Sequence, residues 1–322
     1  MTEYMLANRK AELIFGLAIL MACGVPAASM AHPIDLYPKL GGFALREPEM
    51  PTQPGAPQIY STTNNAPNWL ISQWKIAGPK LSAFTTQQEG DSSVYEANAP
   101  TASVRIVEAP TGSTITLGHI GAPVPCLNAS GKPRESDLFL SSIKPMVGVI
   151  PGKTSGYLLP ALNSLREVAS VSVDAGPSTP TKGCKVSKGG AILAIILTDF
   201  AVAPHQVFFY QMSLSEYCRT DILGSVCAMP ASRPTNYTNH NPFGSNDRLA
   251  LLGQPPIQDG ETRSLDIDLL PRLIMAIEDG PPAMDRDPAN WAVTGGYFGL
   301  ISWGDVTVTS TWQNYRLIAD TN

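Results

Sequence analysis

The last thirty or so residues constrain the fold of this chain more than any other stretch. Apolar and polar residues alternate with a period of two between positions 290 and 318, for example in Val306-Thr307-Val308-Thr309. The same stretch contains Trp291, Trp303 and Trp312, three of the five tryptophans of the chain. Half-buried strands that carry large flat side chains show this pattern. We therefore expect the closing strands of a β-sandwich here.

The composition favours the same fold class. Charged residues account for 15% of the chain, which also contains 29 prolines and 27 glycines. Few charges and many turn-forming residues are typical of short strands joined by many loops, and not of helical bundles. We predict an all-β domain at residues 67–322, a jelly-roll-like β-sandwich of two antiparallel sheets. The net charge of -5 provides no basic surface, so nucleic acid is not an expected partner.

Several segments match individual strands. Residues 103–108 and 113–117 alternate on either side of Ala109-Pro110-Thr111-Gly112, whose proline and glycine are typical of a β-turn. This arrangement predicts a hairpin. The continuous apolar runs at 191–197 and 206–212 predict central strands that are covered on both faces.

The tryptophans are expected to divide between the core and the surface. Trp69 and Trp74 bracket a predicted strand near the start of the domain, and an odd spacing on a strand places one inward and the other outward. We expect Trp69, Trp291 and Trp312 to be structural, because most tryptophans of a β-sandwich contribute to its core.

One helix is expected near residues 269–279. Asp268 can cap its first turn, Pro271 is tolerated within that turn, and Gly280-Pro281-Pro282 ends it. The apolar residues that fall on one helical face are Leu270, Leu273, Ile274 and Ile277. This pattern predicts a short helix packed against the otherwise all-β domain.

Residues 1–31 have the pattern of an export signal. Arg9 and Lys10 lie in a polar head, positions 13–22 are apolar, and Ser29-Met30-Ala31 supplies small residues for a signal peptidase. The apolar run is shorter than the roughly 20 residues that cross a bilayer. We therefore expect a cleaved signal peptide and a location outside the cytoplasm, either secreted, periplasmic or at the cell surface.

A second interpretation of the same stretch remains open. Leu20-Met21-Ala22-Cys23 resembles the lipobox of bacterial lipoproteins, in which the cysteine is acylated and becomes the first residue of the mature chain. The signal would then comprise residues 1–22, and acyl chains on Cys23 would anchor the protein to a membrane. Under either interpretation, the proline-rich segment 32–66 is predicted to be an arm or tether that precedes the domain.

Export leaves four cysteines, Cys126, Cys184, Cys218 and Cys227, in an oxidising compartment. Four cysteines permit three pairings. The short spacing between Cys218 and Cys227 favours a bond that closes a small loop, which leaves Cys126 to pair with Cys184. The second bond would stabilise the fold by about 4 kcal/mol in the loop-entropy account. No two cysteines have the spacing of a zinc site with histidines nearby, so zinc is not expected.

Aromatic and amide side chains indicate a carbohydrate ligand. The apolar face of a sugar stacks on an exposed aromatic ring, and nearby amide and carboxylate groups accept or donate hydrogen bonds to its hydroxyls. Trp303 with Asp305, and Tyr237 with Asn239 and His240, therefore predict a shallow glycan-binding site. The alternative for Trp303 is a core position.

Acidic residues raise two further hypotheses. A sugar-cleaving enzyme would need two neighbouring carboxyl groups, one protonated and one ionised. Glu216 is the catalytic candidate that we retain, because it follows an apolar strand beside the expected cysteine-closed loop, although a solvated loop acid is the simpler interpretation. Asp285, Asp287 and Asn290 bring three oxygen ligands together, as a calcium ion requires, but an acidic turn has the same residues. No other cofactor is expected.

These patterns lead to one main functional hypothesis and two alternatives. The main hypothesis is a secreted or surface-exposed, non-catalytic carbohydrate-binding protein whose partner is a glycan or polysaccharide. It depends partly on analogy between folds, which is a weak basis for function. The alternatives are an extracellular polysaccharide hydrolase or lyase with paired carboxylates, and a structural cell-surface protein that binds other proteins. Membrane association is expected only through a lipid anchor at Cys23.

Overall fold

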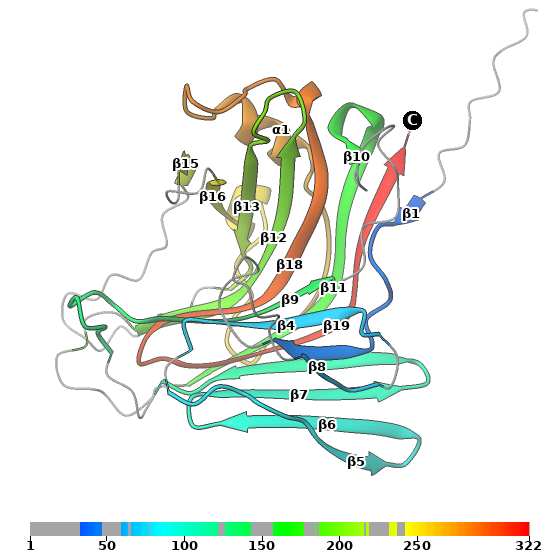
Figure 1. Cartoon of the computed structure of the whole chain (residues 1–322), viewed down its shortest axis with the longest axis vertical. Helices are drawn as coiled ribbons and strands as arrows, with labels where there is room; N and C mark the ends of the chain where they lie inside the picture. The colour runs from blue at the N-terminus through cyan, green and yellow to red at the C-terminus, as the bar shows by residue number, and fades with distance from the viewer. Residues whose placement is uncertain are drawn as a thin grey trace, which may run out of the picture. The chain divides into compact units, whose positions relative to one another are not determined.

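Two β-sheets pack against each other, and the hydrophobic core lies between them (Figure 1). The computed structural model describes residues 33–46, 59–63, 66–76, 78–121, 126–142, 157–176, 184, 187–215, 217–218, 232–236 and 242–321. They all belong to one unit of the chain, residues 31–322. The expected export signal, including Cys23, lies outside the described residues.

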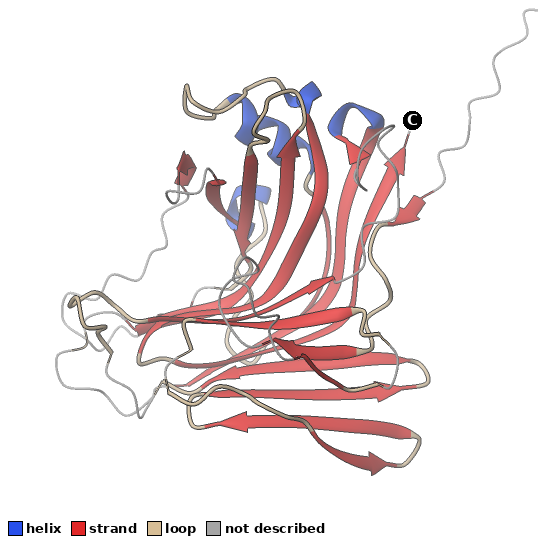
Figure 2. Cartoon of the chain, viewed as in Figure 1, coloured by secondary structure: helices blue, strands red, loops and turns tan. Residues whose placement is uncertain are grey.

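Strands make up most of the regular structure (Figure 2). Within the described part of the chain, one sheet has 8 strands. In spatial order these are β17 (Thr262–Asp268), β11 (Leu162–Gly176), β19 (Thr307–Thr321), β8 (Gly112–His119), β7 (Ala102–Ala109), β6 (Ser92–Ala99) and β5 (Thr85–Glu89), with β1 (Pro33–Asp35) paired to β19.

The other sheet has 11 strands, counted over the same described residues. Its spatial order is β15 (Ser232–Asn236), β16 (Pro242–Arg248), β13 (Val207–Ser213), β12 (Ser187–Asp199), β18 (Trp291–Gly304), β9 (Glu135–Ser142), β4 (Trp69–Trp74), β2 (Phe43–Arg46) and β3 (Ile59–Ser61). Two short strands join it at the side: β10 (Tyr157–Leu158) pairs with β18, and β14 (Tyr217–Cys218) pairs with β12. Short 3-10 helices are η1 (Leu159–Ala161), η2 (Leu249–Leu252) and η3 (Pro288–Asn290).

The predicted all-β sandwich is confirmed. Neighbouring strands run antiparallel, except for the parallel pairs β2–β4 and β13–β16. The predicted hairpin is β7–β8, whose register joins Ala109 to Gly112. The two apolar runs are β12 and β13. Strand β12 is covered on both faces, because the successive residues Leu193 and Ala194 are both buried.

The closing strands β18 and β19 belong to different sheets, and their inward aromatic side chains meet in the core. The ring of Phe298 on β18 lies 3.8 Å from that of Tyr315 and 4.8 Å from that of Trp312, both on β19. Trp69 of β4 packs on Phe298 from the side at 5.5 Å. Trp69, Trp291 and Trp312 are fully buried, so their predicted structural role is confirmed. These rings hold the two sheets together.

Part of the segment predicted to be an arm belongs to the sandwich. Strand β1 pairs with β19, while β2 pairs with β3 and β4. Leu36, Phe43 and Leu45 are fully buried in the core. The sequence did not indicate these strands because each spans only three or four residues, too few to establish a period of two, and prolines flank them. Residues 32, 47–58, 64 and 65 of this segment lie outside the described residues.

The predicted helix is α1 (Leu270–Glu278). Its N-cap is Leu269, but the Asp268 carboxylate still accepts a hydrogen bond from the Leu270 N–H at 3.1 Å. Arg272 on the helix donates to Asp247 of β16 at 2.6 Å, and this ion pair joins the helix to the 11-stranded sheet. Within the described part of the chain, no helix combines the length and the apolar character needed to cross a membrane.

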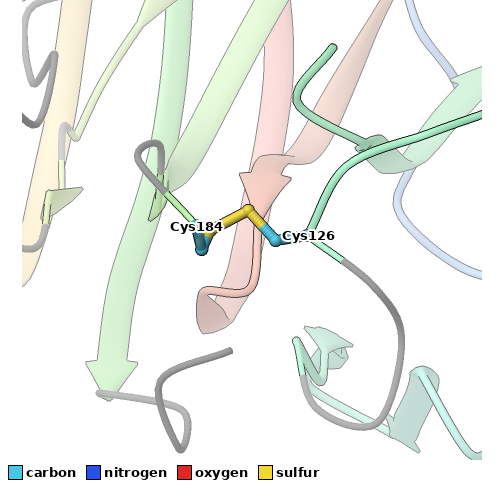
Figure 3. Close-up of a disulfide and its surroundings, with 2 residues drawn as sticks. All are labelled: Cys126 and Cys184. Atoms are coloured by element: carbon cyan, nitrogen blue, oxygen red, sulfur yellow. A yellow bond between two sulfur atoms is a disulfide. The ribbon is translucent and has the colours of Figure 1, made fainter. Parts of the chain in front are cut away.

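The predicted bond between Cys126 and Cys184 is confirmed (Figure 3). It joins segments 58 residues apart, and the two Cα atoms are 5.5 Å apart. Cys218 is also disulfide-bonded; Cys227, its expected partner, lies outside the described residues. Disulfides persist in oxidising compartments, so this bond indicates a protein that functions outside the cytoplasm.

One carboxyl group is buried within the core. Glu167 of β11 faces inward, where its Oε1 atom accepts a hydrogen bond from the Tyr315 hydroxyl at 3.0 Å. Among the described residues, its Oε2 atom has no hydrogen-bond partner. Burial raises the pKa of Glu167 to about 8, although the hydrogen bond from Tyr315 opposes this shift. The folded protein therefore holds Glu167 protonated at neutral pH.

This buried acid predicts a specific dependence of stability on pH. The unfolded chain releases the Glu167 proton near the ordinary pKa of 4.5, whereas the folded chain retains it up to about pH 8. The free energy of unfolding should therefore fall as the pH rises from about 4.5 to about 8. Glu167→Gln keeps an oxygen that accepts the hydrogen bond from Tyr315 but has no carboxyl proton to lose. The difference in free energy of unfolding between this variant and wild type should therefore grow in favour of the variant from about pH 4.5 to about pH 8.

Urea denaturation at several pH values would measure this difference. Glu278→Gln, at the exposed end of α1, is a matched control and should show no such growing advantage. Parallel pH profiles for wild type and Glu167→Gln would contradict the assignment of a buried, protonated acid.

Candidate functional site

The outer face of the 11-stranded sheet gathers four chemically active side chains. On β9, the leucines Leu138 and Leu140 point into the core, so Glu135 and Asp137 point outward. The pairing register places Trp74 of β4 directly opposite Asp137, and Trp303 of β18 directly opposite Glu135. Directly opposite residues lie on the same side of a sheet, so the two acids and the two tryptophans share the outer face.

Two lysines complete this group. The Lys75 ammonium lies 2.5 Å from Glu135 Oε2 and 5.6 Å from the centre of the Trp74 ring. Lys188 of β12 is directly opposite Trp303 and lies over its ring at 5.3 Å. Both distances to the rings permit a cation–π interaction. We refer to Trp74, Lys75, Glu135, Asp137, Lys188 and Trp303 as the carboxyl–tryptophan cluster.

The two acids of the cluster have different environments. Asp137 is 1% exposed, and its Oδ1 atom has no hydrogen-bond partner among the residues that the structure describes. The side chain of Glu135 is 28% exposed and forms an ion pair with Lys75. Burial raises the pKa of Asp137 well above its ordinary value, and repulsion from Glu135 adds to this shift, while the charge of Lys75 opposes it. Burial therefore favours the neutral form of the Asp137 carboxyl group, beside the Glu135–Lys75 ion pair.

The same outer face continues as an aromatic and amide surface. The rings of Phe139 on β9 and Tyr297 on β18 lie 4.8 Å apart. The Gln211 side chain donates a hydrogen bond to the Tyr297 hydroxyl. Asn246 of β16 is beside Gln211 in the register of the sheet. Flat rings alternating with hydrogen-bonding groups are the components of a polar-ligand surface.

The structure brings one of the predicted ligand-binding residues to this site. Trp303 belongs to the carboxyl–tryptophan cluster and is partly exposed. Asp305 follows the end of β18 and is fully buried, and its role in ligand binding stays a prediction. The other predicted ligand residues, Tyr237, Asn239 and His240, lie outside the described residues. The catalytic candidate Glu216 also lies outside them.

The predicted calcium ligands form an acidic turn. Asp285 accepts hydrogen bonds from the Asp287 N–H at 2.9 Å and the Asn290 side-chain amide at 2.8 Å. Asp287 caps η3 by accepting from the Ala289 N–H at 3.0 Å. Over the described ranges, no three or more His, Cys, Asp or Glu residues form a group suited to a metal ion. Calcium at this turn stays a prediction.

Glu135 and Asp137 were not among the candidates taken from the sequence, although their spacing along the chain could have indicated them. The catalytic candidate taken from the sequence was Glu216, expected beside a cysteine-closed loop, whereas Glu135 and Asp137 belong to β9. Glu135 and Asp137 are separated by two positions and alternate with residues that the sequence assigns to the interior of that strand. Two acids on the outer face of a central strand are unusual, and this spacing could have identified them.

Comparison with known proteins does not assign this chain to a family. No family model and no curated protein matches the chain. Similar solved structures include a loop-swap mutant of Necallimastix patriciarum Xyn11A, at 6% identity and a TM-score of 0.37, covering 73% of this chain and 95% of that chain. A family 11 xylanase from Neocallimastix patriciarum has 8% identity and a TM-score of 0.34, covering 71% and 92%. A family 12 xyloglucanase from Bacillus licheniformis has 9% identity and a TM-score of 0.36, covering 74% and 98%. At such low identities and TM-scores, these similarities identify neither a family nor a ligand.

The burial of Asp137 predicts that this residue lowers the thermal stability of the protein at neutral pH. Because its pKa in the folded protein is raised, ionisation opposes folding once the pH exceeds the ordinary value of 3.8. Asp137→Asn removes that cost because the amide side chain does not ionise. The variant should therefore have a higher melting temperature than wild type at pH 7 and a similar one below pH 3.8. A lower melting temperature at pH 7 would show that ionised Asp137 stabilises the fold.

Proposed function

We propose that this protein binds glycans outside the cytoplasm through the carboxyl–tryptophan cluster. The observation that carries the proposal is the pair of partly exposed indoles, Trp74 and Trp303, on one face of the sheet with Glu135 and Asp137 between them. An indole offers a flat apolar surface to a sugar ring, and carboxyl groups form hydrogen bonds with its hydroxyls.

The positions of Trp74 and Trp303 favour a role in ligand binding over a role in packing the core. Trp69, Trp291 and Trp312 are fully buried in the core, whereas Trp74 and Trp303 face away from it. A lysine ammonium lies near each outer ring, at 5.6 Å from the centre of the Trp74 ring and 5.3 Å from that of Trp303. Strands β4, β9 and β18 are neighbours inside the sheet, so the site has a rigid base on which a ligand loses little additional freedom.

The proposed location depends on two features. The Cys126–Cys184 bond supports an oxidising compartment. The export pattern in residues 1–31 adds a route to that compartment, with release after Ala31 or a lipid anchor at Cys23 as the two outcomes. The protein is then secreted, periplasmic or attached to the cell surface, where polysaccharides are accessible.

Glycan-array screening followed by calorimetry tests the proposal. Wild type should bind one class of glycan, and Trp303→Ala or Trp74→Ala should weaken that affinity about tenfold, as expected for the loss of roughly 1.4 kcal/mol of stacking. Met275→Ala is the matched control, because Met275 is 49% exposed on α1, a different part of the fold. It should bind like wild type.

Two results would contradict the proposal. Unchanged affinity in both tryptophan variants would place the glycan elsewhere on the molecule. Failure of the wild type to bind any glycan, together with specific binding to another surface protein, would favour the structural alternative. Thermal denaturation of every variant separates lost binding from lost folding.

A further inference from the structure

A buried carboxylate lies at the end of β12, next to the acidic turn of residues 285–290. Asp199 is the last residue of this strand, and its side chain points inward, as those of Ile195 and Leu197 do. Asp199 is 0% exposed, and its Oδ2 atom has no hydrogen-bond partner among the described residues. A buried polar atom without a partner is rare in folded proteins and requires an explanation.

Strand pairing brings Asp285 to the same place. Asp199 is directly opposite Trp291 of β18, so the two side chains lie on one face of the sheet. The Trp291 indole N–H donates a hydrogen bond to the Asp285 backbone carbonyl at 3.0 Å. The Phe200 N–H donates to the Asn290 carbonyl at 3.1 Å, which holds the other end of the turn against β12. The acidic turn is therefore fixed beside Asp199.

Gln206 provides a further link between the two acids. The Asp199 N–H donates to the Gln206 backbone carbonyl at 2.9 Å, and the Gln206 side-chain oxygen accepts from the Asp285 N–H at 2.9 Å. Burial raises the pKa of Asp199 and repulsion from Asp285 adds to this shift, although a hydrogen bond from the Ala201 N–H opposes it. A cation bound by both carboxylates would remove their repulsion and give Asp199 Oδ2 a partner.

The chemistry of the available ligands favours calcium. Calcium prefers oxygen ligands, and it accepts neutral carbonyl, amide and water oxygens in the remaining positions of an irregular shell. Asp285 accepts hydrogen bonds from the Asp287 N–H and the Asn290 amide, but each carboxylate oxygen has a second lone pair for a metal ion. Over the described ranges, no group of three or more acidic, histidine or cysteine residues is suited to a metal, so neutral oxygens must complete the shell.

We propose that Asp199 and Asp285 bind a calcium ion that holds residues 281–290 to the ends of β12 and β18. The Asp287 carboxylate, which the sequence also offered as a ligand, caps η3 and is not part of this pair. Two carboxylates are typical of a weak site, with a Kd of roughly 10⁻⁴ to 10⁻³ M, the range of extracellular calcium modules. This calcium site is separate from the proposed glycan-binding function and is tested without a glycan.

Calorimetric titration of the EDTA-treated and dialysed full chain with calcium chloride tests the site. Wild type should bind calcium, and Asp199→Asn or Asp285→Asn should each weaken the affinity at least about tenfold, because each removes one of the two charged ligands. Asp91→Asn is the matched control, because Asp91 is exposed in the turn between β5 and β6. It should bind calcium like wild type.

Thermal denaturation separates a calcium ligand from a residue that only supports the fold. Calcium at ten times its Kd should raise the melting temperature of wild type by about 3 °C. Equimolar magnesium should raise it less, because magnesium demands a more regular shell. Asp199→Asn should melt no lower than wild type in EDTA, because it relieves the repulsion from Asp285, yet it should lose the calcium response. A residue with only a structural role would lower the melting temperature equally with and without calcium.

Terbium luminescence reports the position of the ion. Terbium(III) replaces calcium in oxygen-lined sites and emits light when a neighbouring tryptophan is excited. Trp291 is hydrogen-bonded to Asp285, so wild type should show sensitised emission that added calcium displaces. Trp291→Phe should lose most of this emission.

Three results would overturn the calcium site. The first is a wild type that binds no calcium. The second is undiminished calcium affinity in both Asp199→Asn and Asp285→Asn, which would place the ion elsewhere. The third is a melting temperature of Asp199→Asn that lies below that of wild type by the same amount in EDTA and in calcium. None of these results would bear on glycan binding.

Discussion

The packing of Phe298 against Tyr315 and Trp312 is the contact on which the arrangement of the site depends. It joins β18 of one sheet to β19 of the other, at ring distances of 3.8 and 4.8 Å. Aromatic side chains bury large apolar surfaces and pack in specific orientations, so this contact fixes which face of β18 points inward. Because side chains alternate along a strand, it also fixes Trp303 and Tyr297 on the outer face.

The same alternation gives β9 two distinct roles. Its leucines contribute to the core, whereas Glu135 and Asp137 contribute to the carboxyl–tryptophan cluster. The neighbouring strands then bring Trp74 and Trp303 beside these acids through the register of the sheet alone. Burying Asp137 opposes folding, and the apolar contacts on the other face of the same strand offset that cost. A destabilising group retained at one place on a stable scaffold is typical of a functional site.

The sequence predicts the fold better than the site, for a physical reason. The β7–β8 hairpin, helix α1 and the strands β12 and β13 depend on local periodicity and turn chemistry, which neighbouring residues reveal. The Cys126–Cys184 bond followed from cysteine counting and loop length. The cluster instead depends on pairing among β4, β9, β12 and β18, which are distant in the sequence, and no local pattern encodes that register. The short strands β1, β2 and β3 escaped prediction because tertiary burial, not periodicity, determines them.

A crystal structure of the protein with a bound oligosaccharide from its preferred glycan would test the central claim most directly. Our account predicts a sugar ring stacked on the indole of Trp303 or Trp74, with a hydroxyl or glycosidic oxygen within hydrogen-bonding distance of Glu135 or Asp137. An oligosaccharide bound away from the outer face of β4, β9 and β18 would contradict it.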